Sequence, residues 1–146
     1  MTASTYSAAA FAFPRSKQLY VVDDDVMFRN SIVFLLESAG FSVAADMTPR
    51  DFLGRLSQLD PGTVLVDLRM PDIDGFDLIK MLGDHITAFP VIVITGHGDI
   101  ASAVRATHLG AADFLEKPVP IDDLIESINA IAALQSVSAA FVPQVR

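Results

Sequence analysis

The chain has 146 residues, 51% of them hydrophobic, with no cysteine and a formal net charge of −8 at pH 7. This length and apolar content suit one globular domain and exclude a disordered chain, and the lack of cysteine excludes disulfides and thiolate metal sites. An acidic chain without a run of Lys or Arg argues against direct nucleic-acid binding. Its apolar stretches are strand-sized or interrupted, so we expect no membrane span, and a reducing, cytoplasmic location fits the composition.

Residues 1–16 are predicted to form a flexible extension. An apolar stretch lies at residues 8–13, but the basic residues Arg15 and Lys17 follow it, whereas a secretion signal carries its positive charge before such a stretch. We expect the folded domain to span residues 17–134 and residues 135–146 to form a C-terminal tail.

From residue 18 onward, strand-like and helix-like segments alternate. Short continuous apolar runs predict the strands, and apolar residues three or four positions apart predict the helices. Asp25 and Thr48 suit N-caps, and Gly40, Gly83 and Gly110 suit helix ends. In chain order the predicted elements are a strand at 19–22, a helix at 26–39, a strand at 41–45, a helix from 48 to beyond 56, a strand at 63–66, a helix at 76–82, a strand at 90–94, a helix at 100–109, a strand at 113–115 and a helix at 121–134.

The alternation predicts an α/β fold. Apolar strands without a polar face are typical of a parallel sheet that is covered on both sides. Right-handed crossovers then give a three-layer, doubly wound (βα)5 domain of the flavodoxin-like type, with five strands in the order 2-1-3-4-5. The switch point of this order lies between the first and third strands, where ligands bind in such sheets.

Acidic residues follow the two strands at that switch point. Asp23 and Asp24 come directly after the first strand, Asp67 ends the third, and Lys117 follows the fifth. Hard cations such as Mg²⁺ prefer carboxylate oxygens, and a strand-end carboxylate can act as a nucleophile that forms an acyl phosphate. This pattern predicts a metal-assisted site that accepts a phosphoryl group on Asp67.

Four sequence pieces surround these residues. They are Val-Val-Asp-Asp-Asp at 21–25, Asp-Leu-Arg-Met-Pro-Asp-Ile-Asp-Gly at 67–75, Ile-Thr-Gly-His-Gly-Asp at 94–99 and Gly-Ala-Ala-Asp-Phe-Leu-Glu-Lys-Pro at 110–118. With these pieces in this order, the chain is similar to the response-regulator receiver domains (CheY-like), and within them to the FixJ-type receivers. The resemblance implies that a histidine kinase or phosphotransfer protein donates a phosphoryl group to Asp67, and that the domain catalyses only this transfer and its own dephosphorylation.

The family pattern assigns a ligand set to these positions. It implies that Mg²⁺ (or Mn²⁺) is held by Asp23, Asp24, Asp67 and the backbone carbonyl of Arg69. Lys117 offsets the repulsion among the carboxylates and would bind a phosphoryl oxygen as a point charge. The same resemblance implies a cis peptide bond before Pro118.

The resemblance also implies a switch. Thr95 would donate its hydroxyl to the phosphoryl group, and the space that it leaves would be taken by Phe114, which shifts the surface of the fourth helix and fifth strand. Arg69 and His97 line the mouth of the site in this family and tune the phosphoryl lifetime, although His97 equally suits a solvated residue.

The first predicted helix places Phe28, Ile32, Leu35, Leu36 and Ala39 on one arc that we expect to face the core. Further apolar residues flank this arc, which is more than a solvent-facing helix needs. We expect the kinase to dock on this helix. We expect a downstream protein or a second copy to bind the surface of the fourth helix (100–109), the fifth strand (113–115) and the fifth helix (121–134). The flanking residues are Val26, Met27, Val33 and Phe34.

Several alternatives stay open. Residues 135–146 do not suit a helix-turn-helix module, which favours a single-domain regulator with protein–protein output. An excised FixJ-type receiver or a binding-only receiver-like module is the alternative. Residues 72–75 resemble a haloacid-dehalogenase motif and part of a calcium loop, yet the residues around them fit neither. No Gly-rich nucleotide fingerprint follows the first strand.

Overall fold

A computed structural model describes the backbone of residues 18–141 and the side chains of residues 18–135. The predicted extension at 1–16 lies outside the described residues, as does the end of the predicted tail. Within the described part, no helix is long and apolar enough to cross a bilayer.

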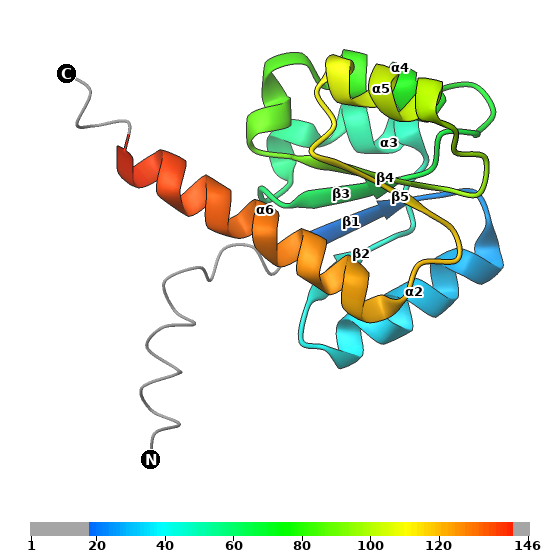
Figure 1. Ribbon diagram of the computed structural model, residues 1–146, viewed down its shortest axis with the longest axis horizontal. Helices are drawn as coiled ribbons and strands as arrows, with labels where there is room; N and C mark the ends of the chain where they lie inside the picture. Colours follow the sequence, from blue (N-terminus) through cyan, green and yellow to red (C-terminus); the bar gives the residue numbers. More distant parts are fainter. Residues whose placement is uncertain (1–17, 142–146) are drawn as a thin grey trace.

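The sheet has five parallel strands in the order β2-β1-β3-β4-β5, which confirms the predicted topology (Figure 1). Each strand lies within one residue of its predicted bounds. The three central strands are almost wholly buried, because helices cover both faces of the sheet. The strands are β1 Gln18–Val22, β2 Ser42–Ala44, β3 Thr63–Val66, β4 Val91–Thr95 and β5 Asp113–Glu116.

The helices form two outer layers, with α2 and α6 on one face of the sheet and α3, α4 and α5 on the other (Figure 1). Alternate residues of each strand serve the two cores: Leu19 and Val21 pack toward α2 and α6, whereas Tyr20 and Val22 pack toward α3 and α4. The helices are α2 Val26–Ser38, α3 Pro49–Gly54, α4 Gly75–Leu82, α5 Ile100–Leu109 and α6 Ile121–Phe141, with 3-10 turns at η2 Leu56–Gln58 and η3 Gly83–Thr87.

Helix α6 is seven residues longer than predicted. Residues 135–141 contain neither Gly nor Pro, and the first helix-breaking residue is Pro143, so nothing in the sequence ends the helix at Leu134. Helix α3 is shorter than predicted, because the chain turns into η2 after Gly54. The prediction that Leu35 faces the core is wrong: its exposed fraction is 41%. Ile32 and Leu36 carry the buried stripe of α2, and Leu35 lies about 100° around the helix from Leu36.

Side-chain caps fix where the helices begin beside the carboxyl edge of the sheet. Asp25 caps α2 by accepting the amide of Phe28, as predicted. Thr48 and Asp51 form a capping box at α3, and Asp74 forms one with Asp77 at α4. These caps tie the loops after β1, β2 and β3 to rigid helices.

Candidate active site

Three carboxylates meet at the carboxyl edge of the sheet, where β1 and β3 end side by side. Asp23 and Asp67 are buried, with 5% and 7% of their surface exposed, whereas Asp24 is exposed. Each offers one oxygen, and these three oxygens all lie within 4.8 Å of one another. The topology thus brings together the acids that the sequence predicted, although more than forty positions separate Asp24 from Asp67 in the chain.

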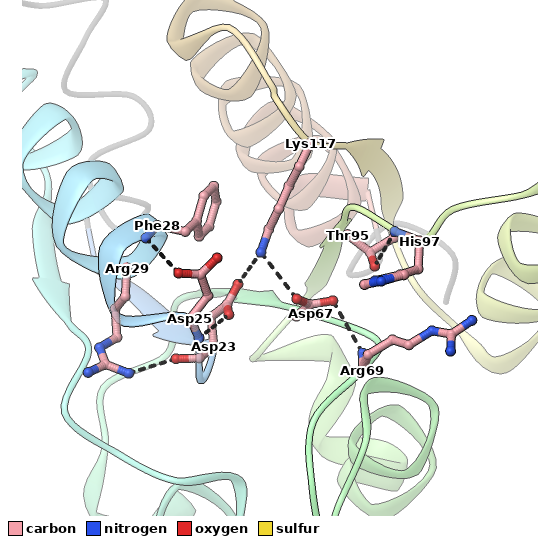
Figure 2. A network of polar contacts seen from close by, with 9 residues as sticks. All are labelled: Asp23, Asp25, Phe28, Arg29, Asp67, Arg69, Thr95, His97 and Lys117. Atoms are coloured by element: carbon pink, nitrogen blue, oxygen red, sulfur yellow. Dashed lines mark hydrogen bonds and ion pairs between the residues drawn. The ribbon is translucent and has the colours of Figure 1, made fainter.

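Lys117 connects two of these acids. Its Nζ donates to Oδ2 of Asp23 at 2.9 Å and to Oδ2 of Asp67 at 3.1 Å (Figure 2). The ammonium also lies 4.1 Å from the centroid of the Phe28 ring, a cation–π contact. The backbone amide of Lys117 donates to the carbonyl of Thr95, and the peptide bond to Pro118 is cis, as the family pattern implies.

Burial dominates the electrostatics of Asp23. It raises the pKa of this carboxyl, although the amide of Asp25 and the ammonium of Lys117 favour the charged form. Burial of Lys117 works in the opposite sense on the ammonium, but the hydrogen bonds and charges of Asp23 and then Asp67 outweigh it, so the pKa of Lys117 lies above its ordinary value. Lys117 is therefore a firmly charged cation between the two buried acids at neutral pH.

The position of Asp67 is set by Arg69, Lys117 and the start of α4. Its Oδ1 accepts the amide of Arg69 at 3.2 Å, while Oδ2 faces Lys117. Behind it, α4 begins so close that a Cβ atom on Gly75 would lie 2.7 Å from the carbonyl oxygen of Asp67 and 2.9 Å from Cα of Leu68. Only glycine permits this approach, so Gly75 sets the spacing between the helix and the strand end.

The donor set suits a hard cation. Three carboxylate oxygens within 4.8 Å of one another, two of them on buried residues, match the preference of Mg²⁺ for a few carboxylates plus water. Arg69 follows Asp67 by two residues, so its carbonyl belongs to the same loop, and its role as a ligand stays a prediction. A cavity of about 630 Å³ opens beside Asp23 and Asp24, between the loops after β1, β2 and β3.

The predicted switch residues lie at the ends of β4 and β5. Thr95 is fully buried, and its hydroxyl oxygen accepts the amide of His97 at 3.2 Å. Phe114 is half-buried on the neighbouring strand, and a Cβ atom on Gly98 would lie 2.9 Å from its ring and 3.5 Å from Cγ2 of Thr95. Thr95, Phe114 and the backbone of Gly98 therefore share one small space.

The two residues predicted at the mouth of the site, Arg69 and His97, are both exposed. The side chain of Arg69 points away from Asp67, and only its amide contacts that carboxylate (Figure 2). The sequence reasoning missed Arg29, whose guanidinium donates to the carbonyl of Asp23 at 2.7 Å. Its place in the first turn after the acidic run was the one available signal. Phe28, expected only in the core, also contacts Lys117.

Comparison with known proteins gives one consistent family. A family model for the response regulator receiver domain matches residues 19–129. The transcriptional regulatory protein FixJ of Bradyrhizobium diazoefficiens is 46% identical over 112 residues, which are 77% of this chain and 55% of that protein. The C4-dicarboxylate transport transcriptional regulatory protein DctD of Pseudomonas aeruginosa is 41% identical over 117 residues, which are 80% of this chain and 25% of that protein.

A solved structure agrees. The crystal structure of FixJ-N covers 81% of this chain and 94% of its own, with a TM-score of 0.74 and 39% identity. The chain spans about half the length of the curated FixJ relatives that it matches. The family match covers most of the folded domain and includes every site residue described above. The chain therefore belongs to the response regulator receiver domain family of two-component signalling proteins.

Proposed function

We propose that this receiver accepts a phosphoryl group on Asp67 from a histidine kinase or a phosphotransfer protein and then changes which protein it binds. Receiver domains interact with histidine kinases and bind Mg²⁺ in an acidic pocket. The observation that supports this role most directly is the placement of Asp67. It is buried, one of its oxygens lies within 4.8 Å of an oxygen of Asp23 and of Asp24, and it contacts Lys117 at 3.1 Å.

The proposed reaction needs one nucleophile. A carboxylate oxygen of Asp67 attacks the phosphorus of the donor phosphohistidine, a P–O bond forms, and the P–N bond breaks with its electron pair returning to the imidazole nitrogen. Bound Mg²⁺ would neutralise charge on the phosphoryl oxygens, held by Asp23, Asp24, Asp67 and the Arg69 carbonyl. Hydrolysis returns Asp67 when water attacks the phosphorus and the acyl oxygen leaves as carboxylate.

Lys117 prepares the site for the added charge. Phosphorylation brings about −1.5 to −2 charges to a place where two buried carboxylates already lie. The Nζ of Lys117 donates to Oδ2 of both Asp23 and Asp67, so its charge lies beside the carboxylate that would carry the phosphoryl group. We assign it the role of charge neutraliser in the transfer.

Thr95 and Phe114 form the proposed switch. The hydroxyl of Thr95 accepts the amide of His97, which leaves its hydrogen free to donate to a phosphoryl oxygen. Movement of Thr95 toward Asp67 would enlarge the space next to Phe114. The ring of Phe114 borders this space, because a Cβ atom on Gly98 would lie 2.9 Å from the ring and 3.5 Å from Cγ2 of Thr95. Arg69 and His97 would tune the phosphoryl lifetime, since both are exposed beside the acceptor.

Two exposed apolar faces support the proposed partners. On α2, Met27 is 83% exposed, and Val26 and Phe34 are also exposed; this face would receive the kinase. On α5, which packs beside β5, Ile100 is 84% exposed and Val104, one turn later, is also exposed; this face would receive a downstream protein or a second copy. We place the domain in the cytoplasm with its kinase, and beyond phosphotransfer and autodephosphorylation we assign it no enzyme activity.

Intact-mass measurement tests the acceptor. The full chain is incubated with Mg²⁺ and acetyl phosphate or phosphoramidate, and one phosphate-sized gain is expected that disappears in Asp67→Asn and in the absence of Mg²⁺. Asp60→Asn, at an exposed acid before the first residue of β3 and not at its carboxyl end, is the matched control and should still gain the phosphate. A folded chain that gains no mass would leave a receiver-like module that only binds partners.

A further inference from the structure

The loop between β3 and α4 contains a strained turn at Asp72. Its φ is 73°, and among residues 18–141 no other non-glycine residue has a positive φ. The amide of Ile73 donates to the carbonyl of Pro71 at 2.9 Å, which closes an i to i+2 turn around Asp72. A γ-turn with positive φ at its centre is rare and strained, and a residue with a side chain keeps it only when its surroundings hold it there.

Arg50 holds the side chain of Asp72. Its Nε donates to Oδ2 at 2.6 Å and its Nη2 donates to Oδ1 at 3.0 Å, so the guanidinium forms a bidentate pair with the carboxylate. These hydrogen bonds, with the charge of Arg50, hold the pKa of Asp72 below its usual value, so the pair is charged at neutral pH. Both side chains are exposed, yet the two-point geometry restricts how Asp72 can turn.

The backbone of Arg50 is itself held in place. It is the second residue of α3, whose first turn is closed by the capping box of Thr48 and Asp51. Phe52, two residues later, is fully buried against Tyr20 and Phe89 in the core. The guanidinium therefore reaches Asp72 from a rigid helix end and not from a loop.

The turn belongs to the segment that follows the acceptor. At one end, the amide of Arg69 donates to Asp67; at the other, the amide of Gly75 donates to the carbonyl of Leu68. Met70 and Ile73 are buried, so Pro71 and Asp72 form the exposed tip. A change of conformation at this tip would alter the backbone that leads back to Arg69, whose carbonyl is a proposed metal ligand.

The same pair borders the space beside the acids. Arg50, Pro71 and Asp72 line the cavity of about 630 Å³ that also reaches Asp23 and Asp24. The ion pair thus joins α3 to the β3–α4 loop at the border of the cavity that Asp23 and Asp24 also line.

We propose that Arg50 is a positioning residue for the metal site: by gripping Asp72 it keeps the strained turn in place and so fixes the backbone of the loop after Asp67. The proposal rests on the proposed Mg²⁺ site. It differs from a direct electrostatic role, in which the positive charge of Arg50 would weaken the binding of a cation and its removal would strengthen it.

Four variants of the full chain test this idea, with Mg²⁺ affinity measured by calorimetry and amide hydrogen exchange of residues 68–74 measured without metal. Arg50→Ala should weaken Mg²⁺ binding about twofold to fivefold, the scale of an exposed ion pair, and speed exchange at the loop. Arg50→Lys keeps the positive charge but cannot form the bidentate pair with Asp72, so it should also weaken Mg²⁺ binding. Asp72→Gly should bind Mg²⁺ nearly as well as the unaltered chain, because glycine adopts positive φ without strain.

The decisive variant is Arg50→Ala combined with Asp72→Gly. With no strained side chain to hold, the loss of Arg50 should cost no further affinity. Arg55→Ala, at an exposed arginine at the other end of α3, is the control and should leave both readouts unchanged.

Three results would overturn the proposal: tighter Mg²⁺ binding in Arg50→Ala, unchanged loop exchange and affinity in that variant, or an equal loss of affinity whether residue 72 is Asp or Gly. Absence of Mg²⁺ binding in the unaltered chain would overturn the metal site and this proposal together. Mg²⁺ binding without phosphorylation of Asp67 would overturn the proposed function alone.

Discussion

The ammonium nitrogen of Lys117 lies 2.9 Å from Oδ2 of Asp23, a contact between residues 94 positions apart in the chain. It joins the loop after β5 to the end of β1, with β3 and β4 between them in the sheet. The same nitrogen contacts Asp67, so one cation offsets two buried carboxylates. Without that cation, the charges of Asp23 and Asp67 would lie in a buried place where water and other side chains stabilise them less well.

Lys117→Met should therefore destabilise the metal-free protein. We expect a loss of about 1–3 kcal/mol in the free energy of unfolding, because buried charged acceptors lose their donor while the side-chain volume is kept. Urea unfolding at pH 7 in the presence of a chelator measures it. Lys80→Met is the control, since Lys80 forms only an exposed pair with Asp77 at 4.0 Å and should change stability little. Equal stability of the two variants would contradict the role of Lys117.

Asp23 should give stability an unusual pH dependence. Burial raises its pKa in the folded protein above the ordinary value of 3.8, so the folded state binds the proton more tightly than the unfolded chain. Its contribution to stability is fully present below pH 3.8 and is lost as the pH rises through the raised pKa. Relative to Asp23→Asn, the unaltered metal-free chain should thus lose stability as the pH rises above 3.8, and the loss should level off once the pH has passed the raised pKa. Urea unfolding at a series of pH values checks this; a stability difference that rises with pH would contradict it.

The fold was predictable because its signals are local. Apolar strands without alternation require a sheet covered on both faces. Capping residues and glycines in the sequence mark where most of the helices begin and end. The length of α6 was missed because residues 135–141 lack a stop signal. Leu35 was misplaced because its apolar character does not show that Ile32 and Leu36 are the residues of α2 that become buried. Burial on one helix depends on the neighbouring elements.

The site was predictable to the extent that strand ends meet. Asp23, Asp67 and Lys117 follow parallel strands, so their approach follows from strand order. The contacts of Arg29 and Arg50 could not be derived in this way, because they depend on the path of loops and on a positive φ at Asp72. Loop conformation is set by tertiary contacts that the sequence pattern does not display.

Gly98→Ala should bias the proposed switch. The new methyl group would lie 2.9 Å from Cε1 and 3.3 Å from Cζ of Phe114, too close for both groups to stay in place. Because the ring end can move while the backbone cannot, we expect Phe114 to be displaced. Fluorine NMR of fluorophenylalanine-labelled protein should show a shifted Phe114 resonance before phosphorylation and a smaller change on addition of beryllofluoride.

Gly96→Ala is the control for that variant. The nearest atom to its new methyl group would be Cβ of Lys117 at 4.0 Å, an ordinary contact. Its Phe114 resonance should match that of the unaltered chain. If Gly98→Ala leaves the resonance and its response to beryllofluoride unchanged, Phe114 does not depend on this space.

Gly75→Ala should damage the acceptor directly. The methyl group would meet two backbone atoms, the carbonyl oxygen of Asp67 at 2.7 Å and Cα of Leu68 at 2.9 Å, and neither can swing aside as a side-chain end can. Helix α4 must then shift from the end of β3, at a cost of about 1–3 kcal/mol in the free energy of unfolding. Because the shift displaces Asp67 from Lys117 and the other carboxylates, acetyl phosphate should label the variant more slowly at saturating Mg²⁺.

Gly54→Ala provides the contrast: no atom lies within 4 Å of its new methyl group, so stability should be unchanged or about 0.4–1 kcal/mol higher, with normal labelling. Normal labelling and stability in Gly75→Ala would show that the strand end tolerates a wider spacing from α4.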